Sequence, residues 1–134
     1  MAIENFVYLT MAEAVKFHVL YMRRVGETRF GVFDKNLVES ALARPRHAAI
    51  YENADIYRQA ATLVFGLVKN HPWEGGNKRT ATFWTNLYLK RNNYKITAPT
   101  GELIEMVLAV ESDVWKVDEI ENWLRSRIQK FEGT

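Results

Sequence analysis

Apolar residues recur at helical spacing along most of this chain. In the first segment, Thr10 and Glu13 stand three residues apart, which is the spacing of a capping box at a helix N-terminus. Behind this pair, one stripe repeats every three to four residues: Met11, Val15, His18, Met22 and Val25. We therefore predict a first helix in which His18 is a packed, hydrogen-bonded core residue rather than a ligand.

The next helical pattern is short and ends at a proline. Asp34 is a suitable N-cap for a helix that carries Leu37, Val38, Ala41 and Leu42. Because proline disfavours a helical conformation at the residue before it, we expect this helix to stop near Pro45. Residues 46–54 are then predicted to be a polar connection that carries tyrosine.

A third helix is predicted to lie at the centre of the fold. Asp55 can cap it, and its members are almost all apolar: Ala60, Ala61, Leu63, Val64, Phe65, Leu67 and Val68. A helix with almost no polar face is expected to be surrounded by other helices. Pro72 predicts that it ends at Asn70 and His71.

The second half of the chain continues the helical pattern. A fourth helix over residues 77–92 is expected to bury Phe83, Trp84, Leu87 and Tyr88, and residues 94–99 are predicted to be a short extended piece. Further helices are predicted over residues 101–111 and behind a capping pair formed by Asp118 and Glu121. The last of these would bury Ile120, Trp123, Leu124 and Ile128. For Trp115 and Trp123, core packing and a groove for a partner are both open.

Length and composition indicate one folded domain. The 134 residues fit a single compact domain over residues 1–134, with 48% hydrophobic and 25% charged residues. A net charge of +2 is too small to predict extensive wrapping of nucleic acid. Cysteine is absent, which excludes disulfides and thiolate metal sites. No secretory signal or membrane span is recognisable, so we expect a cytoplasmic, all-α protein.

The segment HPWEGGNKR, residues 71–79, concentrates candidate chemistry between the third and fourth predicted helices. Gly75 and Gly76 permit unusual backbone conformations and leave N–H groups uncovered. The start of the helix at Asn77 adds unpaired donors and the positive end of a helix dipole. Lys78 and Arg79 add cations that suit phosphate oxygens. The segment therefore indicates an anion cradle.

His71 stands beside this cradle. A histidine next to a bound phosphate can take a proton from an attacking hydroxyl, which is general-base catalysis. The alternative is a solvated interhelical loop with a helix-terminal histidine near the last carbonyls. The residues alone leave these two interpretations evenly matched, and the spacing is not that of a Walker A loop.

The quoted residues carry a family resemblance. HPWEGGNKRTA resembles the Fic/Doc signature H-P-F-x-[DE]-G-N-x-R, and Lys78 resembles the death-on-curing (Doc) branch rather than the AMP-transferring Fic branch. The likeness extends upstream to GVFDKNLVESALARP. It implies a compact all-helical bundle around a buried central helix. It also implies a toxin of a toxin–antitoxin pair that transfers a phosphoryl group from ATP to a hydroxyl of elongation factor Tu and so inhibits translation.

The same resemblance implies roles for single residues. His71 resembles the base that activates the target hydroxyl, and Gly76, Asn77 and Arg79 resemble the residues that hold the phosphates. Lys78 is either a further phosphate ligand or an exposed cation of the first helical turn.

One position departs from the family pattern. Where the family has an acidic residue that holds Mg²⁺, this chain has Gly75, and its acidic residue, Glu74, comes one position early. Glu74 is thus a candidate surrogate metal ligand. A catalytically impaired protein that binds nucleotide or antitoxin without turnover, and an AMP-transferring Fic-like enzyme, are the alternatives. Trp73 replaces a Phe and is expected to anchor the loop in the core.

Partners follow partly from the resemblance. The chain lacks the [ST]-x-x-x-E-[GN] inhibitory motif of some Fic proteins, so restraint of a toxin is expected from a second chain, an antitoxin of the prevents-host-death type. The segment with Arg44, Arg46, His47 and Tyr51 corresponds roughly to where Fic relatives dock a target, although a solvated loop is the equal alternative. A small anion- or nucleic-acid-binding module is the third, least favoured class.

Overall fold

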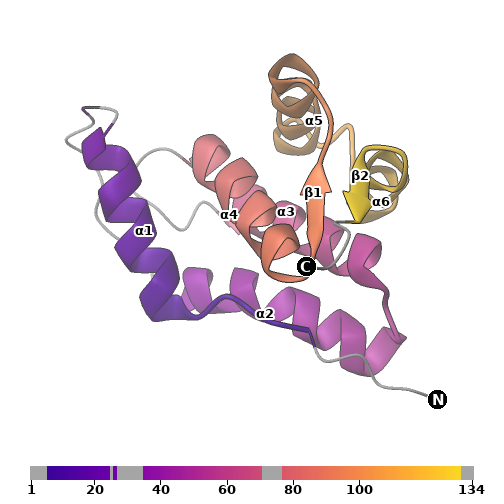
Figure 1. The fold of residues 1–134 in the computed structure, drawn as a ribbon, viewed down its shortest axis with the longest axis horizontal. Helices are drawn as coiled ribbons and strands as arrows, with labels where there is room; N and C mark the ends of the chain where they lie inside the picture. The colour runs from indigo at the N-terminus through magenta and orange to yellow at the C-terminus, as the bar shows by residue number, and fades with distance from the viewer. Residues whose placement is uncertain (1–5, 25, 27–34, 71–76, 131–134) are drawn as a thin grey trace.

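The computed structural model describes residues 6–24, 26, 35–70 and 77–130 (Figure 1). In these ranges the elements run α1 (Met11–Arg24), α2 (Lys35–Glu52), α3 (Ile56–Asn70), α4 (Asn77–Arg91), β1 (Tyr94–Ile96), α5 (Thr100–Glu111), α6 (Val117–Arg125) and β2 (Ile128–Lys130). The all-α class predicted from the sequence is confirmed. Among the described residues, no helix is long and apolar enough to cross a membrane.

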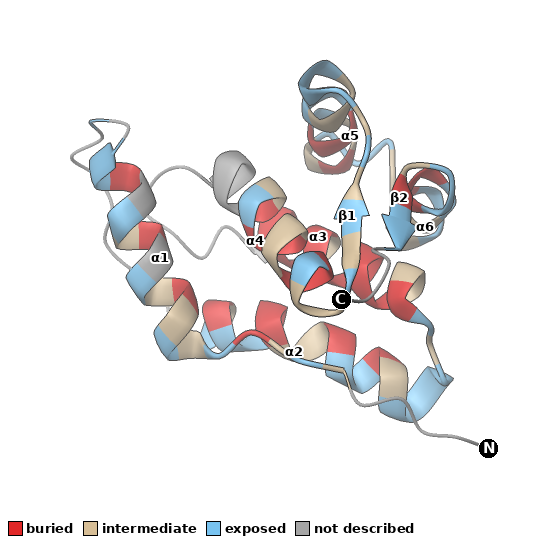
Figure 2. Ribbon diagram, viewed as in Figure 1, coloured by how far each residue is buried: buried red, intermediate tan, exposed pale blue. Residues whose placement is uncertain are grey.

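Helix α3 is the centre of the bundle, as its apolar sequence predicted. It packs against α2, α4, α5 and α6, and most of its residues are buried (Figure 2). The side chains of Leu63, Val64, Leu67 and Val68 are each only 1% exposed. Asp55 caps the helix, because its Oδ1 accepts a hydrogen bond from the Arg58 N–H at 3.0 Å. The helix ends at Asn70, as Pro72 predicted.

The predicted end of the second helix near Pro45 is wrong. Helix α2 continues through Pro45 to Glu52, so residues 46–52 are helical and not a polar connection. An internal proline costs a helix about 3 kcal/mol. Burial of Val38, Ala41 and Ala48, which lie on both sides of the proline, offsets this cost.

The first helix agrees with its sequence pattern. The Glu13 N–H donates to Thr10 Oγ1 and the Thr10 N–H donates to Glu13 Oε1, each at 3.1 Å, which confirms the predicted capping box. His18 is buried, 1% exposed, as expected of a core histidine. Burial lowers the pKa of His18 to about 4, so its imidazole is neutral at neutral pH.

The C-terminal third corrects two predictions and confirms one, the extended piece after α4. The N-cap of α6 is Lys116, whose N–H donates to Glu119 Oε1 at 2.8 Å, and the predicted Asp118–Glu121 pair instead faces Arg58. The extended piece predicted after α4 is β1, and it pairs antiparallel with β2. Ile128 therefore lies in a strand opposite Ile96, not in the last helix.

Of the remaining predictions for aromatic residues, some are confirmed and one is wrong. Trp84 and Tyr88 are buried as expected, but Phe83 is 43% exposed, because it lies on the side of α4 that turns away from α3. Trp123 is buried and Trp115 packs partly buried against the core, so core packing is the interpretation that holds for both.

Candidate functional site at the junction of α3 and α4

The HPWEGGNKR segment spans the junction between two packed helices. Helix α3 ends at Asn70 and α4 begins at Asn77, so Asn77, Lys78 and Arg79 are the first three residues of α4. The predicted site residues His71, Glu74 and Gly76, together with Trp73, lie outside the described residues. The same is true of the side chains of Asn77, Lys78 and Arg79, whose backbone alone is described.

The N-terminus of α4 supplies the electrostatics of an anion site. The first four N–H groups of a helix have no carbonyl partner within that helix, and the helix dipole places partial positive charge at the same end. A phosphate or carboxylate is the group that this arrangement stabilises. Lys78 and Arg79, the basic residues of the first turn, add positive charge at this end of α4.

Apolar burial fixes the direction in which α4 leaves the junction. Ala81, Trp84 and Thr85 are each at most 1% exposed, and this face of α4 packs on α3. On the opposite side of the contact, Leu67 and Val68 bury the last turns of α3. The two helix ends that flank the motif are therefore held by the core.

One ion pair holds the described C-terminal turn of α3 to the chain that follows α5. Lys69 Nζ donates to Asp113 Oδ1 at 2.5 Å and to the Glu111 carbonyl at 3.4 Å. The hydrogen bond from Lys69 lowers the pKa of Asp113, so this carboxylate is ionised at neutral pH.

The far ends of α3 and α4 are joined by a buried polar network. Gln59, which is fully buried, accepts hydrogen bonds at Oε1 from Tyr88 at 2.7 Å and from Tyr8 at 3.1 Å. Its Nε2 donates to the Ala54 carbonyl at 3.0 Å. Burial raises the pKa of Tyr88 and of Tyr8, so both hydroxyls remain protonated donors. The network sets the spacing of α3 and α4 well away from the motif.

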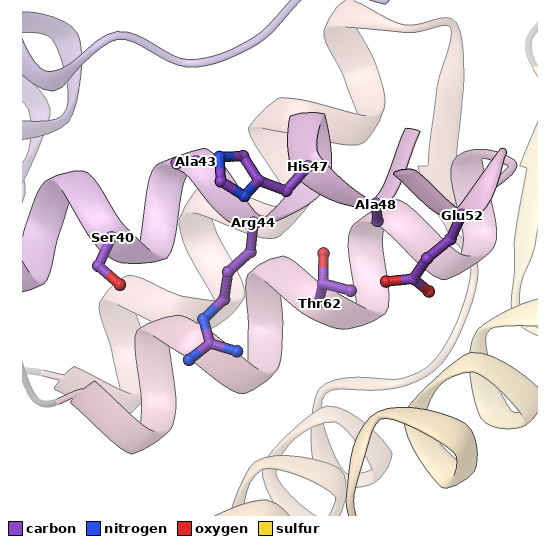
Figure 3. A pocket seen from close by; sticks show the side chains of 7 residues that line it. All are labelled: Ser40, Ala43, Arg44, His47, Ala48, Glu52 and Thr62. Carbon is purple, nitrogen blue, oxygen red and sulfur yellow. The ribbon is translucent and has the colours of Figure 1, made fainter. Parts of the chain in front are cut away.

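A concave region lies between α2 and α3. It has a volume of about 340 Å³ and is shown in Figure 3. Its lining consists of Ser40, Ala43, Arg44, His47, Ala48, Glu52 and Thr62. The solvated-loop alternative for the segment with Arg44 and His47 is wrong, since both residues are on α2.

Sequence reasoning singled out Arg44 and His47 of this region, but neither its other lining residues nor Gly66, which lies beside Arg44. Thr62 and Gly66 lie on α3, and nothing in their local pattern distinguishes them from other core positions. Only the packing of α2 on α3 brings them beside Arg44. Among the described residues, no group of three or more His, Asp or Glu side chains is arranged to hold a metal ion.

A comparison with models of known protein families shows the family to which the chain belongs. The model of the Fic/DOC family matches residues 8–89, which is more than half of the 134-residue chain and includes the whole HPWEGGNKR segment. The protein therefore belongs to the Fic/DOC family. A comparison with curated proteins found no match. The family supports a Fic-type protein-modifying enzyme.

Proposed function

We propose that this protein is a Doc-type toxin of a toxin–antitoxin pair. In this proposal it transfers a phosphoryl group from ATP to a hydroxyl of a protein target, elongation factor Tu, and so inhibits translation. The observation that carries the proposal is the junction itself: HPWEGGNKR begins directly after the buried central helix, and Asn77 begins α4. Lys78 at the variable signature position favours the phosphoryl-transferring branch.

His71 is the general base in this proposal. It takes the proton from the target hydroxyl as that oxygen attacks the γ-phosphorus of ATP. The new bond joins the target oxygen to phosphorus, and the bond from phosphorus to the bridging oxygen breaks, so that ADP leaves. A positioned base of this kind contributes typically about 10²- to 10⁴-fold to a rate.

The start of α4 holds the phosphates. Backbone N–H groups near Gly76 and Asn77 meet phosphate oxygens, and Arg79 adds a two-pronged contact. Lys78 contributes a point charge. This division predicts that Arg79→Ala weakens ATP binding more than Lys78→Ala does, because the fork loses geometry as well as charge.

Mg²⁺, when bound, neutralises charge on the phosphates. The chain offers Glu74 for it, one residue before the position at which the family has its acidic residue, and Gly75 stands at that position. A catalytically impaired protein is the second candidate, and Gly75 is the observation that favours it.

An antitoxin of the prevents-host-death type is proposed to restrain the toxin in the cytoplasm. Such segments commonly lay a helix or an extended tail into an apolar groove of the partner. Co-expression with the antitoxin encoded next to this chain should relieve toxicity and give a stable complex. Failure of both would contradict this partner.

The transfer reaction is tested with two labelled forms of ATP. Purified protein is incubated with Mg²⁺, elongation factor Tu and ATP labelled on either the γ- or the α-phosphorus. Label from the γ-position on the target supports phosphoryl transfer, whereas label from the α-position supports AMP transfer. His71→Ala should abolish labelling while circular dichroism stays unchanged, and native-rate labelling by this variant would refute the base assignment.

Two substitutions separate the active protein from the impaired one. If Glu74 is the metal ligand, Glu74→Ala should abolish Mg²⁺-dependent labelling. If the site is impaired by Gly75, the native protein should label weakly and Gly75→Asp should label more strongly. Native labelling that survives Glu74→Ala and gains nothing from a folded Gly75→Asp would exclude both roles.

A further inference from the structure

We propose that the groove between α2 and α3 is a second anion-binding site, in which Arg44 holds an oxyanion such as a phosphate or a carboxylate. The described residues that line this groove are on α2 and α3, and the proposal does not depend on the function proposed for the α3–α4 junction. The anchoring group comes from α2, and the floor of the groove comes from α3 (Figure 3).

Close helix packing fixes the position of the Arg44 side chain. A Cβ atom at Gly66 would lie 2.6 Å from Arg44 Cδ and 2.8 Å from Arg44 Nε. The absence of a side chain at Gly66 is therefore what lets the arginine lie along α3. The guanidinium carbon also lies 5.6 Å from the centre of the Phe65 ring, within the range of a cation–π contact. These contacts orient the guanidinium before any ligand arrives.

Within the described part of the chain, this oriented guanidinium has no carboxylate partner. By contrast, Arg58, Arg91, Arg125 and Arg127 each form an ion pair with a carboxylate. Glu52, the acidic residue that lines the groove, lies 3.6 Å from Arg58 Nε and is thus paired there. A partly buried cation without a counter-charge favours an anionic ligand.

The neighbouring polar groups suit the same ligand class. Ser40 lies four residues before Arg44, on the same face of α2, and its hydroxyl is a potential donor. The Thr62 hydroxyl donates to the Gln59 carbonyl at 2.7 Å and so leaves the donor role to Arg44 and Ser40. A planar guanidinium fork matches two oxygens of one phosphate or carboxylate.

The test follows the Arg44 Nε–Hε signal by NMR during titration of the folded protein with inorganic phosphate and, separately, with acetate. A saturable shift is expected. The stronger response identifies the source: phosphate points to a phosphoryl group, and acetate to an acidic side chain or a chain terminus.

Three variants give the controls. Gly66→Ala keeps the charge but displaces the side chain, and should weaken binding by about tenfold because the guanidinium loses its orientation. Arg44→Gln should abolish saturable anion binding in the groove. Because this variant lacks the Arg44 Nε–Hε signal, its binding is measured from the backbone amide signals of Ser40 and Thr62. Arg46→Gln removes an exposed charge two residues away and should leave the Arg44 titration unchanged.

Two outcomes overturn the proposal. One is an Arg44 signal that fails to saturate with either anion. The other is equal loss of binding in Arg44→Gln and Arg46→Gln, which would mean diffuse charge rather than a site. Arg79→Ala should leave the Arg44 titration unchanged, so failure at the junction and failure in the groove are distinguishable.

Discussion

The two ends of α3 are held by different kinds of interaction. Near its N-terminal end, Gln59 joins two tyrosine hydroxyls and a carbonyl, and Arg58 pairs with Asp118 at 2.6 Å. At its C-terminal end, the described contacts are the apolar burial of Leu67 and its neighbours and the Lys69 pair. Both regions are on the same 15-residue helix, about 14 Å apart along its axis.

This difference bears on how the motif is positioned. Polar networks are directional and fix the register of the elements that they join. Apolar packing fixes position without using polar groups. The chain thus uses a network of directional contacts far from the motif, and uses apolar burial with a single described ion pair, Lys69–Asp113, where α3 leads into it. That division suits the proposed site, where polar groups are needed for a ligand.

The largest expected effect comes from the motif end. Leu67→Ala should lower the free energy of unfolding by about 2–5 kcal/mol, because it leaves a cavity where the Leu67 side chain, only 1% exposed, is buried. Urea denaturation measures this loss. Ile50→Ala, at a side chain that is 63% exposed, is the matched control and should change the free energy by less than about 0.5 kcal/mol. Equal losses would mean that the last turns of α3 do not depend on packing.

The polar end should be slightly less sensitive. Gln59→Leu keeps a similar volume but leaves the buried Tyr88 hydroxyl, the partly buried Tyr8 hydroxyl and the Ala54 carbonyl without their partner, so a loss of about 2–3 kcal/mol is expected. Tyr8→Phe removes one donor and should cost about 1 kcal/mol in the same urea experiment. A Gln59→Leu variant as stable as the parent would show that the network contributes nothing net.

A pH measurement tests whether α1 unfolds together with α3. The pKa of His18 is about 4 in the folded protein and about 6.5 in the unfolded chain, so the unfolded state binds the proton more readily. Stability should fall as pH falls through this window, by about 1.5 kcal/mol between pH 6.5 and 5.

His18→Leu supplies the control for this slope. The difference in unfolding free energy between the parent and His18→Leu should change across the same pH range, above the titration of most carboxyl groups. A difference that does not change with pH would contradict the lowered pKa. If a separate unfolding transition appeared, and only its free energy depended on pH in this range, α1 would be shown to unfold independently of α3.

The smallest effect is expected at the Lys69–Asp113 pair. Lys69 lowers the pKa of the exposed Asp113 carboxyl, so the stability that the pair contributes is present above the unfolded pKa and is lost as pH falls through the folded one. Asp113→Asn should therefore lower the melting temperature at pH 7 less than Gln59→Leu does, and salt should reduce the effect. A larger drop than that of Gln59→Leu would reverse the comparison of the two ends.

Local patterns in the sequence were sufficient for several elements. The capping box of Thr10 and Glu13 and the cap at Asp55 involve residues three apart, which any helix start brings together. The end of α3 at Asn70 follows from Pro72, and the apolar run of α3 predicted its central place. The HPWEGGNKR segment was placed correctly between two helices, α3 and α4, and its role as a site stays a prediction.

Long-range packing decided the rest. Pro45 lies inside α2 because burial against α3 exceeds the cost of the lost hydrogen bond. Ile128 joins a strand because Ile96, more than thirty residues earlier, offers it a partner. The setting of Arg44 beside Gly66 needs two helices to cross, and no pattern within α2 or α3 encodes that contact. Helix caps and stops depend on neighbours in sequence, whereas these features depend on neighbours that only the folded chain brings together.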